Sequence, residues 1–432
     1  MKTGLSNWYS LIGGCLLLLA LTQANGVELD LTARTGLEAS NNMTLSNEGG
    51  EQDVRQTVGF DLEVLETGRS IQADISLSVE HSKYYQKSYS DETSLGAGVG
   101  VLNFGLIDSF LDWRSSFRRS EVITDSSNRY NPDSREYRNI VRSGPVLNYQ
   151  LSRATALEFS SSYVGVENSD PDVSDSERVD NFLGLSYDIN PLTELSLNGS
   201  YANVIDGDEL DTFEDASVNV GLVRQFVNGQ LSINIGRTRF IPETGDHREG
   251  NFFDIGFNRD QLFLHDWTLR YNEDISDTSI GFDNEEDALE SENTDTLNIN
   301  GTDILERRRF TLRAGREIGR MFYELSSRWE EEDYLVQLSD QRSHRADAQL
   351  RSRISPVLTL GAAYSWQSDN FIDVPSTGKD ITSSYEVNST YLFSQDVSLD
   401  GYLRYENRIN SVNDGREYEG VFVGADLSWT LL

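Results

Sequence analysis

Apolar and polar residues alternate along most of this chain, in short runs separated by polar connections. The last run shows the pattern most clearly, with apolar or small residues at every second position: Val421, Val423, Ala425, Leu427, Trp429 and Leu431. Successive side chains of a β-strand point to opposite faces, so this period of two gives each strand one apolar face. From Val27 to Leu432 the pattern predicts β-strands whose two faces meet different surroundings.

An export signal precedes these strands. Lys2 supplies a positive start, Leu11–Leu21 form a short apolar core, and Thr22-Gln23-Ala24 ends in a small residue. This layout predicts a signal peptide over residues 1–24, and its core is too short to anchor the chain in a bilayer. A lipoprotein site at Cys15 is the alternative, although most apolar residues follow Cys15 instead of preceding it. Cleavage after Ala24 leaves a chain without cysteine, which excludes disulfides and thiolate catalysis.

An exported chain with this alternation is typical of a transmembrane β-barrel. Hydrophobic residues make up 37% of the sequence, the mean hydropathy is −0.47, and no apolar stretch is long enough for a membrane helix. The chain also has 19 Tyr, 19 Phe and six Trp, which suit aromatic girdles at two membrane interfaces. We therefore expect residues 25–432 to form one all-β, antiparallel up-and-down barrel in the cell outer membrane. A soluble β-sandwich or propeller remains the alternative.

Short and long connections alternate, as they do between periplasmic turns and extracellular loops. The predicted hairpins join Val54–Leu65 to Ile71–His81, Ser143–Leu151 to Thr155–Gly165, Leu183–Ile189 to Leu195–Asn203, Ala216–Phe226 to Leu231–Phe240, Ala346–Ile354 to Leu358–Trp366, and Tyr385–Leu392 to Val397–Tyr405. The runs give about 20 strands, with a range of about 18 to 22, and both mature termini in the periplasm. Asp295–Glu306 alternates only briefly, and we assign it to a loop.

The chain is strongly acidic, with 71 Asp and Glu against 36 Lys and Arg and a formal net charge of −35. Such a protein would repel phosphate, which argues against nucleic acid as a partner. The carboxylates gather in predicted connections such as Glu167–Glu177, Asp206–Asp215 and Asp283–Glu292. We interpret these segments as solvated extracellular loops.

The charged face of each strand should line the lumen, because charges are not left in the hydrocarbon band. In the C-terminal third this face carries arginines interleaved with carboxylates. The predicted lumen-lining residues are Arg309, Arg313, Arg328, Arg345, Asp347, Arg351, Arg353 and Arg404. Two interpretations stay open: the guanidinium groups guide an anionic or hydroxyl-rich polymer, or they pair with neighbouring carboxylates and stiffen a polar wall.

No catalytic, metal or cofactor site is predicted. The four histidines, His81, His247, His265 and His344, have no motif that places them beside a nucleophile, and no G-x-S-x-G occurs. An acid pair cannot be singled out among so many carboxylates. The segment Asp206–Asp211 is rich in oxygen ligands, but it departs from EF-hand spacing and fits an ordinary acidic loop better.

Several phrases of the sequence carry a family resemblance. They are Leu102–Asp112 (LNFGLIDSFLD), Ser143–Tyr163, Leu305–Leu335 and Arg345–Trp366, which contains RISPVLTLGAAYSW. In these phrases the chain resembles the outer-membrane β-barrel proteins associated with exopolysaccharide loci and the PEP-CTERM protein-sorting system. The resemblance implies a link to making or exporting surface polysaccharide. One departure is the C-terminus, which ends in Leu432 and not in the aromatic residue usual for barrels.

Two functions of different classes follow. The first is a porin-like channel associated with exopolysaccharide biosynthesis or export, with outer-membrane lipid, lipopolysaccharide, exopolysaccharide and periplasmic export proteins as expected partners. The second is a non-transporting surface anchor whose acidic loops bind partners or cations. A lumen blocked by loops would favour the anchor, and a continuous wet path would favour the channel.

Overall fold

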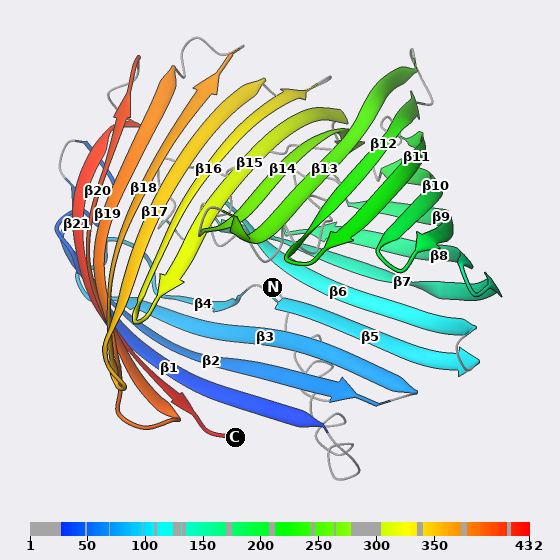
Figure 1. The fold of residues 1–432 in the computed structure, drawn as a ribbon. Coiled ribbons are helices and arrows are strands. Elements are labelled where there is room, and N and C mark those ends of the chain that lie inside the picture. The colour runs from blue at the N-terminus through cyan, green and yellow to red at the C-terminus, as the bar shows by residue number, and fades with distance from the viewer. Residues whose placement is uncertain are drawn as a thin grey trace, which may run out of the picture.

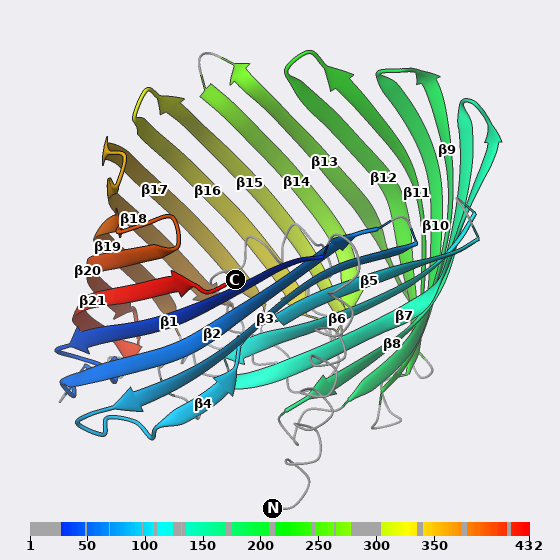
Figure 2. The ribbon, with the colours of Figure 1, turned by 90° about the horizontal axis from the view of Figure 1, so that it is seen from below.

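Antiparallel strands follow one another around one continuous wall in the computed structural model of the chain, and the last strand pairs with the first (Figures 1 and 2). The structure describes residues 27–432 except 48–49, 69, 97, 108–109, 124–130, 132–134, 170–174, 207–211, 243–246, 263–264, 278–303, 335–339, 373–377 and 413–415. The predicted signal peptide, the alternative site at Cys15 and most of the acidic segments Asp206–Asp211 and Asp283–Glu292 lie outside these residues.

The strands run in chain order around the wall. Their bounds are β1 Glu28–Ser40, β2 Asp53–Thr67, β3 Ile71–Tyr84, β4 Glu92–Leu95, β5 Gly98–Ile107, β6 Leu111–Ile123, β7 Arg135–Ser152, β8 Thr155–Asn168, β9 Ser176–Asn190, β10 Thr193–Asp206, β11 Phe213–Phe226, β12 Gly229–Pro242, β13 Arg248–Leu262, β14 His265–Asp277, β15 Ile304–Ile318, β16 Met321–Tyr334, β17 Gln341–Ser355, β18 Leu358–Phe371, β19 Lys379–Leu392, β20 Val397–Asn410 and β21 Tyr418–Thr430.

These elements fill 20 positions in the barrel, because β4 and β5 pair with different parts of the same neighbour. β4 pairs with the upper part of β3, from Val79 to Ser82, and β5 pairs with its lower part, from Ile71 to Ser76. The interruption falls in the glycine-rich stretch around Gly96, where a Cβ atom would lie 2.2 Å from Ser78 Oγ. The prediction of an antiparallel barrel of about 20 strands is confirmed.

Pairing between β1 and β21 closes the barrel. The register runs from Thr32 opposite Thr430 to Ser40 opposite Phe422, and Leu431 N donates to Leu31 O at 2.7 Å. Closure satisfies the backbone groups that an open edge would expose to lipid. Both ends of the described chain lie at the rim that carries the short turns, as Figure 2 shows for the C-terminus.

All six predicted hairpins are present, but most strands reach further into the long connections than the alternation indicates. β16 continues to Tyr334 and β20 to Asn410, and β15 begins at Ile304, so assigning the last residues of Asp295–Glu306 to a loop was wrong. Above the bilayer both faces of a strand meet water or polar groups. The strand can therefore continue there without the apolar alternation that reveals it within the membrane.

The outer face is apolar and bounded by aromatic residues. Leu197, Val387 and Leu403 are 50–61% exposed there, although they are large hydrophobic residues. A row of tyrosines, Tyr364–Tyr385–Tyr405, crosses β18, β19 and β20, with ring centroids 4.8 and 6.2 Å apart. A closed wall with an apolar exterior is the solution that a lipid bilayer requires of strands, so this is an outer-membrane barrel. Within the described residues no helix is long and apolar enough to span a membrane.

Candidate functional site: the inner wall of the barrel

The strand register decides which side chains face the lumen. Across β15, β16 and β17, Thr311 stands opposite Arg328, and Arg328 stands opposite Arg345. These residues alternate with Leu325 and Leu350, which are 56% and 43% exposed on the outer face. The same alternation places all eight predicted lumen residues on the inner side of β15, β16, β17 and β20.

Most of these arginines have a carboxylate partner. Arg309 Nε and Nη2 both donate to Glu330 Oε1, at 2.9 and 2.6 Å, and the two side chains are 13% and 9% exposed. Arg345 Nε lies 3.1 Å from both oxygens of Asp347. Arg313 Nε lies 3.7 Å from an oxygen of Glu324. On β15, β16 and β17 the geometry therefore favours the second interpretation, in which charge pairs stiffen a polar wall.

Arg404 lies between two buried carboxylates. Its Nη2 atom is 3.5 Å from Glu38 Oε2 and its Nε atom is 3.9 Å from Glu406 Oε2, while the guanidinium lies 4.8 Å from the Phe422 ring centroid. Glu38 and Glu406 are 6% and 1% exposed. Arg55 reaches the other oxygen of Glu38 at 3.2 Å. Glu38 and Arg55 are not among the predicted lumen residues, because only the closure of β1 on β21 brings this pair to Arg404.

Arg351 and Arg353 are less constrained. Arg351 Nη2 donates to Gln349 Oε1 at 3.0 Å, and its guanidinium lies 5.2 Å from the Phe322 ring centroid. Arg353 is exposed and makes no side-chain ion pair with any residue that the structure describes. Arg328 lies directly opposite Arg345, another arginine. The predicted row of guanidinium groups is therefore present in register but differs strongly in pairing from one residue to the next.

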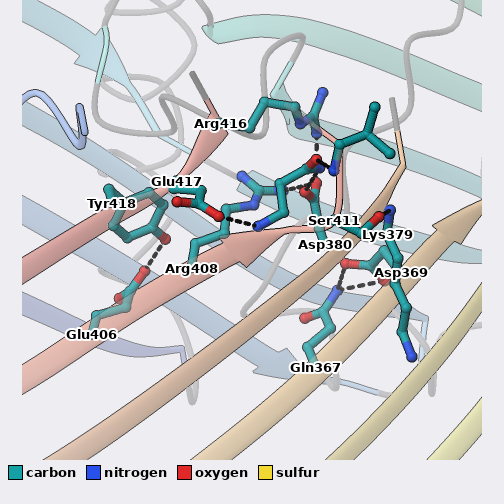
Figure 3. Close-up of polar contacts among 12 residues, drawn as sticks. Gln367, Asp369, Lys379, Asp380, Glu406, Arg408, Ser411, Arg416, Glu417 and Tyr418 are labelled. Atoms are coloured by element: carbon teal, nitrogen blue, oxygen red, sulfur yellow. Dashed lines mark hydrogen bonds and ion pairs between the residues drawn. The ribbon is translucent and has the colours of Figure 1, made fainter. Parts of the chain in front are cut away.

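A buried ion cluster ties an extracellular connection to the wall (Figure 3). Asp380 on β19 is fully buried and accepts hydrogen bonds from Arg408 Nη2 and Arg416 Nη2, each at 2.7 Å, and from Asn410 Nδ2. Arg416 belongs to the connection between β20 and β21. Beside this cluster, the Tyr418 hydroxyl donates to Glu406. Arg416 is thus held against the inner wall at the rim of the long loops.

The first long connection also folds onto the inner wall. Leu45 is 4% exposed and packs against Tyr418 and Phe422, and its backbone adopts a φ of 50°, which is unusual for a leucine. Asn42 Nδ2 donates to Glu419 O and to Ser46 O, at 2.9 Å each. We call residues 41–47 the strap. The described interactions hold it against β21 by a buried apolar contact and by hydrogen bonds.

The connection between β3 and β4 reinforces the strap. Asp53 is 2% exposed and accepts hydrogen bonds from Gln86 N at 2.7 Å and from Ser88 N and Ser88 Oγ at 3.0 and 2.6 Å. Tyr89 packs against the cluster that contains Leu45. Farther out in this connection Lys87 donates to both oxygens of Asp91, and this contact lowers the pKa of Asp91.

Burial of inward-facing residues differs between the two halves of the lumen. Near the long loops many of these residues are nearly inaccessible; they include Glu38, Arg138, Val164, Arg178, Val204, Phe240, Arg307, Glu330, Glu406 and Phe422. Towards the short turns, inward-facing residues such as Asp74 and Glu158 are exposed. In this conformation the inner wall is therefore largely buried near the long loops and open to solvent towards the short turns.

The middle of one side of the lumen carries no charge. Its inward residues on β10, β11 and β12 include Ser196, Asn198, Asn219 and Asn234. Asn198 Nδ2 donates to Asn219 Oδ1 at 3.0 Å. Amides and hydroxyls both donate and accept hydrogen bonds, as hydroxyl-rich solutes do.

The histidines sit in structural surroundings. His265 Nε2 lies 2.6 Å from the Tyr323 hydroxyl on the outer face, and His81 Nδ1 lies 2.7 Å from Thr93 Oγ1. No group of three or more His, Cys, Asp or Glu within the described ranges is arranged to hold a metal ion.

No protein-family model matches the chain, and no curated protein matches it by sequence. Solved structures similar to it include a BenF-like porin from Pseudomonas fluorescens Pf-5, with 11% identity, a TM-score of 0.42, and 94% of this chain and 99% of that chain covered. OccK2 (OpdF) from Pseudomonas aeruginosa, solved in complex with glucuronate, has 12% identity, a TM-score of 0.41, and coverage of 94% and 98%. The siderophore receptor PirA from Pseudomonas aeruginosa has 10% identity, a TM-score of 0.46, and coverage of 94% and 81%.

The closed wall, the apolar exterior and the polar interior together make this a porin-like outer-membrane β-barrel.

Proposed function

We propose that the protein is an outer-membrane channel that serves exopolysaccharide biosynthesis or export. The observation that carries the channel part is a closed barrel of 20 strand positions with a polar inner wall. Barrels of 16–18 strands already enclose an aqueous path, so this wall surrounds more space than its own side chains can fill. The uncharged amide and hydroxyl groups on β10, β11 and β12 suit a hydroxyl-rich solute.

The polysaccharide link rests on the strand phrases described above, together with this chemistry of the wall. Outer-membrane lipid, lipopolysaccharide and periplasmic export proteins are the partners that the proposal requires. Deleting the gene should reduce surface polysaccharide, and the full-length gene should restore it. A deletion strain with unchanged polysaccharide would contradict the link and leave the channel to be judged separately.

The channel itself is tested by reconstitution. Purified folded protein in planar bilayers should conduct ions, with current steps that rise when the strap is destabilised. Preparations should first be shown to be folded by their heat-dependent shift on gels. Absence of conductance from folded protein, with the strap intact and with it released, would reject the channel.

The surface anchor is the second candidate, and one observation favours it. Many inward-facing residues near the long loops are buried, and the strap and Arg416 lie against the inner wall there. A lumen that stays filled would make the barrel a membrane anchor for its extracellular loops. The same bilayer experiment separates the two functions. A barrel that is only an anchor should not conduct, either with the intact strap or with the strap released by substitution.

A further inference from the structure

We propose that the periplasmic half of the channel selects for cations, through carboxylates on β1, β2, β3, β8, β9 and β10 that face the lumen and form no ion pair with another described residue. The channel would then admit neutral or amine-bearing glycans and disfavour polyuronates and other polyanions. This inference rests on the proposed function and specifies the charge of the solute.

The first group of carboxylates lies on the strands that follow the seam. Glu28 and Asp30 on β1 share a face with Glu38, and Glu63 on β2 stands directly opposite Asp30. Asp74 on β3 lies on the same face. All four are exposed, and none forms an ion pair with a residue that the structure describes.

The second group lies on β8, β9 and β10. Glu158 faces the lumen opposite Gly184, and Asp188 stands directly opposite Glu194. The alternate residues on these strands, such as Leu185 and Leu195, are exposed on the outer face. The three carboxylates are exposed as well, and within the described part of the chain they too lack a basic partner.

Several of these carboxylates also stand directly opposite another carboxylate on the neighbouring strand. Asp30 faces Glu63, Asp188 faces Glu194, and on β20 and β21 Asp400 faces Asp426. Like charges directly opposite each other destabilise a sheet. Such unfavourable pairs of like charges occur at functional sites, where the rest of the fold compensates for their cost in stability. Repetition of such a pair on three parts of the wall indicates that the negative field itself is used.

The positive side of the wall does not balance this field. Arg309, Arg345 and Arg404 lie against carboxylates, and a pair of opposite charges has a field that fades faster with distance than that of a single charge. Arg114, Arg351 and Arg353 are exposed on the inner face, but the unpartnered carboxylates outnumber them. Screening over about 8 Å at physiological salt still leaves the wall's field strong for a solute confined beside it.

The first experiment measures selectivity in planar bilayers under a KCl gradient. The reversal potential of the wild type should lie closer to the equilibrium potential of K⁺ than to that of Cl⁻. Neutralising two like-charged pairs, with Asp30→Asn, Glu63→Gln, Asp188→Asn and Glu194→Gln together, should lower the K⁺/Cl⁻ permeability ratio by roughly two- to fivefold. Removing repulsion should not harm folding, so this variant should keep its heat-dependent gel shift.

The matched control makes the same change of charge outside the lumen. Glu177, Glu214, Glu249 and Glu419 lie on outward positions near the long loops. Replacing all four by Gln should leave the permeability ratio unchanged at high salt. An anion-selective or unselective wild type, or an equal drop in the control, would overturn the inference while the channel itself stands.

A second measurement does not need conductance. Ser186 faces the lumen between Ala156 and Ser196, beside the second carboxylate group. Ser186→Cys, in a background with Cys15→Ser, is labelled with a cationic and an anionic methanethiosulfonate reagent of similar size. The cationic reagent should react faster, and the fourfold neutralised variant should lose most of that preference. Equal rates for the two reagents, or a preference that survives neutralisation, would refute the inference even if no current is ever observed.

Discussion

At the scale of single residues, the inner wall holds arginines of two kinds. Arg404 is enclosed with Glu38 and Glu406, which are almost fully buried. Arg351 is exposed and bonds to a neutral glutamine. Removing one partner of a buried charge cluster leaves an uncompensated charge, which costs about 3–5 kcal/mol. An exposed charge has water in place of its partner, and its removal changes stability little.

Arg404→Gln should therefore destabilise the barrel far more than Arg351→Gln. The urea midpoint of folded protein in detergent, followed by the gel shift, would measure the difference. Glu406→Gln in the Arg404→Gln background should recover part of the loss, because it removes the buried carboxylate left beside the missing guanidinium group, whereas Glu38 keeps its ion pair with Arg55. Equal midpoints for the two arginine variants would contradict the assignment of Arg404 to a buried cluster.

A substitution at Leu403 tests which face of β20 meets lipid. Leu403 is 51% exposed on the outer face, next to Arg404 on the inner face. Leu403→Arg places a charge in the hydrocarbon band, at a cost of about 2–4 kcal/mol near the bilayer midplane. Leu403→Ala is the matched control for lost volume. Assembly of Leu403→Arg as efficient as that of the alanine variant would mean that this face does not meet lipid.

At the scale of elements, the strap couples a loop to the wall. Leu45 contributes a buried apolar contact with Tyr418 and Phe422, and Asn42 contributes backbone hydrogen bonds. Both act on a backbone that a φ of 50° at Leu45 keeps slightly strained. Contacts of this size can be lost without unfolding the barrel, whose backbone bonds lie elsewhere.

Leu45→Ala with Asn42→Ala should release the strap and raise both the conductance and the rate at which a protease cuts this connection in intact cells. Loss of a buried leucine side chain costs about 2–5 kcal/mol in a well-packed site, enough to shift a local equilibrium strongly. Gln52→Ala, at an exposed position of the same connection outside the strap, is the control. Unchanged current and unchanged cleavage in the double variant would show that the strap does not restrict the lumen.

How far the sequence predicts these features depends on whether lipid or protein surrounds a residue. Alternation predicts strands such as β17 and the inward position of Arg345, because lipid imposes one rule on every outward residue. The same rule makes no prediction above the bilayer. The extensions of β16 and β20 into that region therefore could not be predicted from alternation. It also does not predict the contact between Glu38 and Arg404, which arises from closure of the barrel, or the position of Leu45, which follows from tertiary packing.

At the scale of the whole molecule, the seam between β1 and β21 distinguishes a barrel from an open sheet. Ala39 stands opposite Val423, and Leu37 stands opposite Ala425. Directly opposite residues in an antiparallel pair have Cβ atoms about 4.5–5.5 Å apart. That separation approaches the range in which a disulfide can form.

Ala39→Cys with Val423→Cys, in the Cys15→Ser background, should crosslink under mild oxidation and give a band of altered mobility on non-reducing gels. The pair Ala39→Cys and Leu427→Cys, which is out of register, should crosslink poorly. Equal crosslinking of both pairs, or of neither, would contradict the register of the seam.

The seam also has a consequence for the order of events during biogenesis. Thr32 and Thr430, which share a side-chain contact across it, are separated by 398 positions in the chain. Contacts between residues so distant in sequence form late, so pairing between sequence neighbours precedes closure. Until β21 has been synthesised and exported, β1 has no second neighbour and remains a template for foreign strands. A chain that stalls or is truncated late in translation should therefore behave as an aggregation-prone periplasmic intermediate, dependent on chaperones, although nearly all of its hairpins can form.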